Sequence, residues 1–182
     1  SRTKRFKLPK VVKKWVTNRI LEKSVPIALI TKKDVNVPWT RNSKNPQDQA
    51  FLSLFRNAKS NVNIVSPNLN APVLMEAMVK ALKRGVDINI LLSKNYQDLI
   101  SKMPMAGGTN LKNVKKIKKQ IRKYAKKHPN KKVGVFNIRW FVDRKGRVSR
   151  ESGKDKEKLG KWTSHTKYMS VDNQITVVGS AN

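Results

Sequence analysis

Segments whose apolar residues have helical spacing alternate along the chain with short apolar segments typical of strands. The segment from 46 to 92 shows this most clearly: a helical apolar face at 50–58, a strand at 62–65, a second helical face at 73–82 and a strand at 86–92. The first of these helices follows Asn45-Pro46, a helix start signal, and the second ends near Gly85. A strand, a helix and a strand of these lengths form a right-handed crossover, which makes the two strands parallel. The pattern predicts an α/β fold with helices covering a sheet.

The flanking segments complete this pattern. They are a helix at 11–20, a strand at 25–30, a loop at 31–44, a helix at 111–124, a buried strand at 133–142, a mobile basic loop at 144–161 and two strands at 163–178 about Asp172-Asn173. No internal repeat is present, and 182 residues is the length of one ordinary domain. We therefore expect a single domain.

Charge narrows the classes of partner. The chain has 41 Lys and Arg against 11 Asp and Glu, a formal net charge of +30, and no acidic residue lies between Leu99 and Val142. Such a surface concentrates anions, so nucleic acid, anionic phospholipid headgroups and polyphosphates are the natural partner classes. A basic run of this kind is equally often only the solvated face of a helix, and charge alone does not choose among these partners.

The absence of cysteine excludes some kinds of chemistry. Disulfide bonds, thiolate catalysis and zinc-thiolate sites are all ruled out. No apolar run approaches the roughly 20 residues needed to span a bilayer, and residues 1–14 lack the apolar stretch of a signal peptide. The compartment stays open, and peripheral association with a membrane is compatible with the charge.

One motif near residue 182 points to chemistry at phosphorus. His165, Lys167 and Asp172 form the pattern H-x-K-x-x-x-x-D, and residues 179–182 read G-S-x-N. On a strand, side chains two residues apart project from the same face, so we expect His165 and Lys167 to lie together. A neutral imidazole can attack phosphorus, and an ammonium beside it can hold the nonbridging oxygens. Each residue alone has an ordinary structural explanation, but the pattern as a whole predicts a phosphate site.

This motif resembles the histidine-lysine-aspartate (HKD) signature of the phospholipase D superfamily. Segments 45–50, 66–71 and 106–110 also resemble segments found, in this order, in the second half of phospholipase D-like proteins of fungi and some bacteria. The resemblance implies half of an α/β/α sandwich with a mixed, largely parallel sheet. It would occupy residues 25–182 and be incomplete at its C-terminal end, after a basic helical segment at 1–24.

The resemblance also implies a mechanism that one motif cannot complete. In the family two halves pack face to face, and each contributes a histidine-lysine pair to one site. One histidine becomes a phosphohistidine, and the other protonates the leaving alcohol and then activates water or an acceptor alcohol. No metal or cofactor is required in most members. Here only one motif occurs, so we expect a second HKD half from the same full-length chain or, less readily, from a second copy of the chain.

The motif suggests a role for each candidate residue. His165 is the nucleophile or the general acid, while Lys167, Ser180 and Asn182 bind phosphate oxygens. Asp172 belongs to the catalytic motif, but the intervening residues and turn favour a structural role. Ser66, Asn68 and Asn70 follow a parallel strand at the edge where such sheets bind ligands, although they would equally suit a plain turn. Gly107-Gly108-Thr109 could bind an anion at a helix start, with a plain loop the simpler interpretation.

Three functions are compatible with the motif and the charge of the chain. The resemblance favours hydrolysis or transfer of phosphatidyl groups of phospholipids on an anionic membrane surface. The charge favours a nuclease or nucleic-acid-binding protein of the same superfamily. The third is a catalytically inert half that only completes the sheet.

Overall fold

A computed structural model describes residues 27–30, 46–94, 96, 107–144, 146, 148 and 164–179. The chain divides into two compact units, residues 1–30 and 31–182. Of the first unit, the described residues 27–30 adopt no regular secondary structure, and Ile27 and Leu29 are 91% and 92% exposed. The strand predicted at 25–30 is therefore wrong for these residues, because no described strand pairs with them. The predictions for 11–20 and 31–44, and most of that for 144–161, lie outside the described residues.

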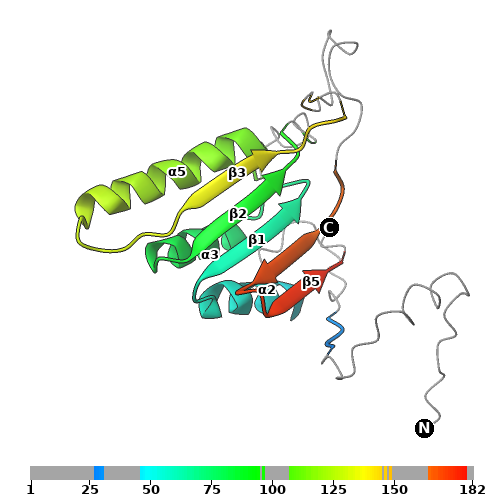
Figure 1. The fold of residues 1–182 in the computed structure, drawn as a ribbon, viewed down its shortest axis with the longest axis horizontal. Coiled ribbons are helices and arrows are strands. Elements are labelled where there is room, and N and C mark those ends of the chain that lie inside the picture. The colour runs from blue at the N-terminus through cyan, green and yellow to red at the C-terminus, as the bar shows by residue number, and fades with distance from the viewer. Residues whose placement is uncertain are drawn as a thin grey trace, which may run out of the picture. The chain divides into compact units, whose positions relative to one another are not determined.

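The second unit is a mixed α/β fold built on a five-stranded sheet (Figure 1). Its elements, in chain order, are α2 (Pro46–Asn57), β1 (Asn61–Ser66), α3 (Pro72–Lys83), β2 (Asp87–Leu92), α5 (Asn110–Lys127), β3 (Phe136–Trp140), β4 (Tyr168–Val171) and β5 (Ile175–Val178). The strand order across the sheet is β3-β2-β1-β4-β5. The helices and strands predicted between residues 46 and 92 are confirmed.

The sheet is largely parallel, with one antiparallel hairpin. Strands β1, β2 and β3 run parallel, whereas β4 runs antiparallel to β1 and β5 antiparallel to β4. The turn between β4 and β5 holds Asp172 and Asn173 at φ values of 53° and 56°, a conformation that Asp and Asn adopt more readily than most residues. The crossover and the hairpin are both confirmed.

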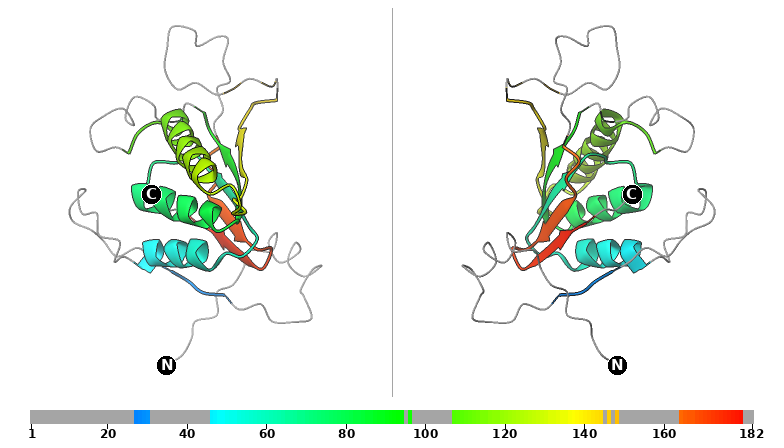
Figure 2. Two further views of the ribbon diagram at one scale, coloured as in Figure 1. Left: turned by 90° about the vertical axis from the view of Figure 1, so that its left-hand side faces the viewer. Right: turned by 90° about the vertical axis from the view of Figure 1, so that its right-hand side faces the viewer.

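The core lies between the sheet and its helices. Helices α2, α3 and α5 cover the same face of the sheet (Figure 2). The burial of β2 alternates along the strand, so that Ile88, Ile90 and Leu92 face the helices and are buried. Phe55 from α2, Leu82 from α3 and Ile117 from α5 pack into the same core. The described elements thus supply one helix layer of the expected sandwich.

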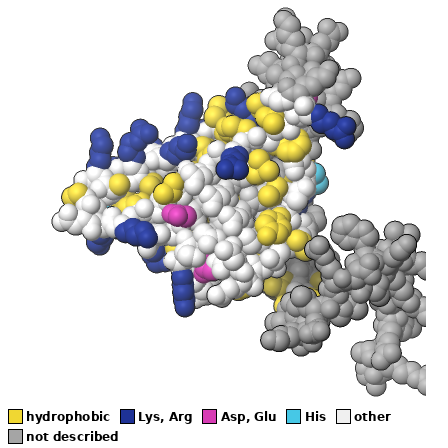
Figure 3. Space-filling model, in the orientation of Figure 1, with side chains coloured by type: hydrophobic (Ala, Val, Ile, Leu, Met, Phe, Trp, Pro, Cys, Tyr) yellow, Lys and Arg dark blue, Asp and Glu magenta, His cyan; other side chains and the backbone are white. Residues whose placement is uncertain are grey.

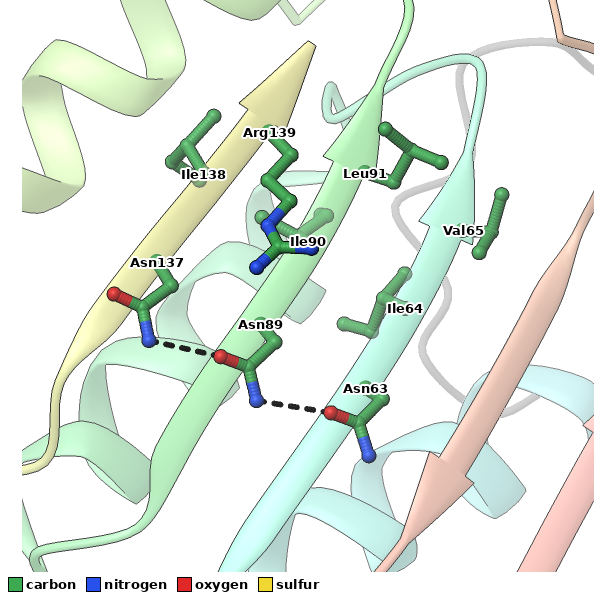
Figure 4. Close-up of a pocket in the computed structure, with 9 residues that line it drawn as sticks. All are labelled: Asn63, Ile64, Val65, Asn89, Ile90, Leu91, Asn137, Ile138 and Arg139. Carbon is green, nitrogen blue, oxygen red and sulfur yellow. Dashed lines mark hydrogen bonds between the residues drawn. The ribbon is translucent and has the colours of Figure 1, made fainter. Parts of the chain in front are cut away.

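The opposite face of the sheet carries a row of asparagine amides (Figure 4). The Asn137 side chain donates to Asn89 Oδ1 at 2.8 Å, Asn89 donates to Asn63 Oδ1 at 2.9 Å, and Asn63 donates to Ser170 Oγ at 3.2 Å. The row borders a shallow hollow of about 600 Å³ that is also lined by Arg139. Most of the Lys and Arg side chains visible on this side of the molecule project from the margin of this face (Figure 3). The amides of Asn137, Asn89 and Asn63 thus bond to one another, which makes this face of the sheet polar.

Candidate functional site

The candidate site lies where the parallel strands end. Val65, next to last in β1, pairs with Tyr168, the first residue of β4. Because β4 runs antiparallel to β1, residues 164–167 continue past the carboxyl end of β1 at the same edge. They have no regular secondary structure. The expectation that His165 and Lys167 lie on a strand is therefore wrong, although both lie directly before one.

His165 and Lys167 contact each other at this edge. Lys167 Nζ lies 3.2 Å from Nδ1 and 3.1 Å from Nε2 of His165, and it also donates to the His165 main-chain oxygen at 3.2 Å. The imidazole is exposed, and its ring centroid lies 5.9 Å from that of Tyr96, which follows β2. An accessible imidazole and an ammonium are thus held together, as a phosphate-binding half-site needs.

Two hydrogen bonds bracket the pair. Ser93, directly after β2, donates from Oγ to the main-chain oxygen of Ser164 at 3.2 Å. Gly179, directly after β5, donates from its amide to the Lys167 oxygen at 3.4 Å. The segment carrying the motif is thereby attached to two different strand ends.

Asp172 lies at the other end of β4 and bonds to the main chain. Its carboxylate accepts from the amides of Lys59 at 2.9 Å, Ser60 at 2.8 Å and Asn61 at 2.9 Å, and from the Ser60 hydroxyl at 2.8 Å. Burial raises the pKa of this carboxyl, but hydrogen bonds from Asn61, Lys59 and Ser60 lower it more, so the pKa lies far below its usual range. These contacts support the structural role of Asp172.

The candidate substrate-edge residues take part in a turn after β1. Ser66 donates from its hydroxyl to the Asn68 main-chain oxygen at 2.8 Å, which closes the turn. The main chain at Asn70 lies so close to Gly107 that a Cβ on this glycine would stand 2.0 Å from the Asn70 oxygen. These contacts support the turn interpretation, and a substrate contact from Ser66, Asn68 or Asn70 stays a prediction.

The glycines before α5 also have a structural explanation. Gly107 and Gly108 have φ values of 81° and 85°, which favour glycine. Thr109 is the N-cap residue, and its hydroxyl accepts from the Lys112 amide at 3.3 Å. Anion binding at this helix start stays a prediction.

Sequence reasoning missed the buried polar side chains behind the site. Ser93, Asn110 and Asn113 are 0%, 2% and 4% exposed. Asn113 donates to the main-chain oxygens of Leu69, Gly107 and Gly108. The sequence did contain one indication of these contacts, the two asparagines in the first turn of a lysine-rich helix. Asparagine is a poor helix former and favours hydrogen bonds to nearby main chain. Ser93 gave no such signal.

Ser180 and Asn182 lie outside the described residues. Within the described part of the chain, no group of three His, Cys, Asp or Glu side chains could hold a metal ion. No helix there is long and apolar enough to cross a membrane.

Comparison with known families shows to which protein family the chain belongs. Residues 51–182 match the family described as "Cardiolipin synthase, PLD-like domain", where PLD denotes phospholipase D. The chain belongs to the phospholipase D-like family. The predicted resemblance to the phospholipase D superfamily is thereby confirmed. No curated protein matches the chain significantly.

Three solved structures are similar over most of this chain. Nuc from Salmonella typhimurium, a phospholipase D family member, is 18% identical, with a TM-score of 0.41 over 73% of this chain and 61% of its own. Phosphatidylserine synthase from Haemophilus influenzae is 19% identical, with a TM-score of 0.42 over 72% and 26%. TrmBL2, an archaeal chromatin protein with a described mode of DNA binding, is 14% identical, with a TM-score of 0.38 over 90% and 44%. The chain spans less than two thirds of each of them, and the family assignment does not rest on these similarities.

Proposed function

We propose that this chain supplies one half of a phosphodiesterase active site, with His165 and Lys167 as its reacting and phosphate-binding groups. The observation that carries the proposal is the contact between these two side chains at the carboxyl edge of the sheet, 3.1 to 3.2 Å from Lys167 Nζ to the imidazole nitrogens. The family match supports it, because the motif lies within the matched residues.

The proposed chemistry needs two histidines. In one assignment, a ring nitrogen of His165 attacks phosphorus, the bond to the leaving oxygen breaks, and a histidine of the second half gives that oxygen a proton. The second histidine then takes a proton from water or an acceptor alcohol, whose oxygen displaces His165 from phosphorus. In the alternative assignment the two histidines exchange roles. In both, Lys167, with Ser180 and Asn182, offsets the charge on the nonbridging oxygens.

A second HKD half is therefore the first proposed partner. The two groups that attack phosphorus and protonate the leaving oxygen must stand on opposite sides of the phosphorus atom, and adjacent residues of one segment cannot do this. The second half would come from the same full-length chain or from a second copy. A contribution of Asp172 to catalysis is not part of the proposal, since its carboxylate is bonded to residues 59–61.

We propose phospholipid as the substrate, hydrolysed or transferred at an anionic membrane surface. The support is the description of the matched family, which names cardiolipin synthase. The net charge of +30 would draw the protein to anionic headgroups. The test is a substrate panel of phosphatidylcholine, phosphatidylglycerol and single-stranded DNA, given to the full-length protein and to its His165→Asn variant. We expect lipid turnover that His165→Asn abolishes, and DNA turnover at background level.

A nuclease is the second candidate, and α5 is the observation that favours it. The helix has 18 residues and exposes lysines at 112, 115, 116, 118, 119, 123, 126 and 127, with Arg122 among them. Val114 and Ile117 on its apolar side are buried in the core, so α5 would bind a polyanion mainly through its exposed basic side chains. Efficient cleavage of DNA with no lipid product would decide for the nuclease.

A further inference from the structure

Ser93 is a buried hydroxyl directly behind the proposed site. It follows the last residue of β2 and is 0% exposed. Its Oγ donates to the main-chain oxygen of Ser164, the residue before His165, at 3.2 Å. A fully buried hydroxyl does not reach a substrate, so its action on the site must pass through the main chain of this segment.

Asn110 in turn fixes Ser93. Its Nδ2 donates to the main-chain oxygens of Ser93 and Pro67, both at 2.7 Å, and its Oδ1 accepts from the Leu69 amide at 2.7 Å. All three contacts of this buried amide go to the main chain beyond β1 and β2. The first turn of α5 therefore links the carboxyl ends of the two strands, and the main chain of Ser93 is joined through Asn110 to the segment after β1.

The motif segment needs such an attachment. Residues 164–167 have no regular secondary structure, so the ladder of the sheet does not fix them. Near the other end of the segment, the Gly179 amide donates to the Lys167 oxygen at 3.4 Å. The hydrogen bond from Ser93 reaches the residue directly before His165, and Asn110 in turn bonds to the main chain of Ser93. The hydrogen bond from Gly179, at the end of β5, reaches Lys167 instead.

We propose that Ser93 is a positioning residue, which holds the main chain before His165 so that the imidazole faces phosphorus in the geometry that attack or protonation needs. The proposal rests on the function proposed above. A catalytic group displaced by about 1 Å can lose about a hundredfold in rate. A single hydroxyl that never touches substrate can therefore control turnover.

The test uses the two histidines of the chain as probe and internal control. His165 lies beside Ser164, while His128 caps the far end of α5 with its ring centroid 4.4 Å from that of Tyr124. In Ser93→Ala, histidine ring resonances in NMR spectra should move for His165 and stay in place for His128. The contact between the rings of His165 and Tyr96 should weaken at the same time.

Ser170→Ala is the matched control. Ser170 is also a buried serine, 6% exposed, but its hydroxyl accepts from Asn63 on the opposite face of the sheet. We expect this variant to leave the His165 resonances unchanged. Unchanged His165 resonances in Ser93→Ala, or an equal movement in both variants, would overturn the proposal.

Turnover by the full-length protein completes the test. Ser93→Ala should lower kcat about ten- to a hundredfold with little change in KM, because binding groups remain while the reacting group is misplaced. A fully active His165→Asn variant overturns the proposed function and the positioning role with it. An inactive His165→Asn beside a fully active Ser93→Ala overturns the positioning role alone.

Discussion

At the scale of single residues, the motif separates into a pair that we propose to react with phosphate and an aspartate with structural contacts. His165 and Lys167 contact each other at the carboxyl edge, whereas Asp172 at the opposite end of β4 bonds to the main chain of residues 59–61. The motif therefore combines a pair of side chains that we propose binds phosphate with a turn residue of the hairpin. Sequence alone predicted the pair, but the partners of Asp172 lie more than a hundred residues away in the chain and could not be predicted.

Asp172→Asn isolates the contribution of this carboxylate. Asparagine keeps the size and tolerates the left-handed φ of 53°, but it replaces one accepting oxygen by a donor that faces main-chain amides. We expect the free energy of unfolding at pH 7 to fall by about 2 kcal/mol, the range for hydrogen bonds to a charged group. Denaturant unfolding measures the loss. Asn173→Asp in the same turn is the control and should change stability by less than about 0.5 kcal/mol.

The same residue predicts a dependence on pH. Because the pKa of Asp172 is lowered in the folded protein, its stabilisation is complete above the pKa of an unfolded aspartate, about 3.9, and is lost as the pH falls from there toward the folded pKa. The difference in stability between the unaltered protein and Asp172→Asn should therefore shrink below about pH 4. A difference that stays constant down to pH 2 would contradict this account.

At the scale of elements, the periodicity of apolar residues predicted the helices. It did not predict where β3 begins, because that depends on a contact with a segment distant in the sequence. The helices α2, α3 and α5 followed from their apolar faces. Strand β3 was predicted as a buried strand over 133–142, but it lies at the edge of the sheet with none of its residues buried, and it spans Phe136–Trp140. The reason for the later start is Gly134, which passes so close to Val86 that a Cβ would stand 1.9 Å from its main-chain oxygen, and whose amide donates to Leu82. The chain enters the sheet only after this crossing.

Helix α5 carries a prediction about binding. Replacing Lys115, Lys116, Lys118 and Lys119 with glutamine removes four exposed positive charges and leaves the buried Val114 and Ile117 untouched. Binding to DNA and to anionic vesicles should weaken, and the slope of log affinity against log salt for duplex DNA should become shallower by up to about 4. Fluorescence anisotropy and vesicle sedimentation at several salt concentrations measure both effects.

The matched control removes the same charge from another segment. Replacing Lys10, Lys13, Lys14 and Lys23 with glutamine gives the same net charge as the α5 variant. If both variants lose binding equally, attraction is a property of the total charge and α5 has no special part in it.

At the scale of the whole molecule, the proposed half-site predicts that this chain alone has no complete activity. The sequence predicted the mixed, largely parallel sheet, but not the strand order or the row of amides on the face that the described helices leave uncovered. Those features depend on which strands pair, and no local pattern determines pairing. The need for a second histidine belongs to the proposed mechanism and stays a prediction.

The isolated chain should be inactive as a monomer. Turnover of a phosphodiester and molar mass in solution, measured together over a range of concentrations, test this. Activity that appears only with dimers, or only after a second HKD half is added, is the expected result. Turnover by a species that stays monomeric at every concentration would disprove the half-site account.

The most direct test of the central claim compares the two histidines in the full-length protein. Both substitutions, His165→Asn and His128→Asn, change one imidazole to an amide, and His128 lies at the end of α5 away from the motif. We predict that phosphodiesterase turnover of His165→Asn falls by at least about a thousandfold, since the covalent and the acid-base routes both lose their group, while His128→Asn keeps near-normal rates. Near-normal turnover by a folded His165→Asn protein would contradict the assignment of this site.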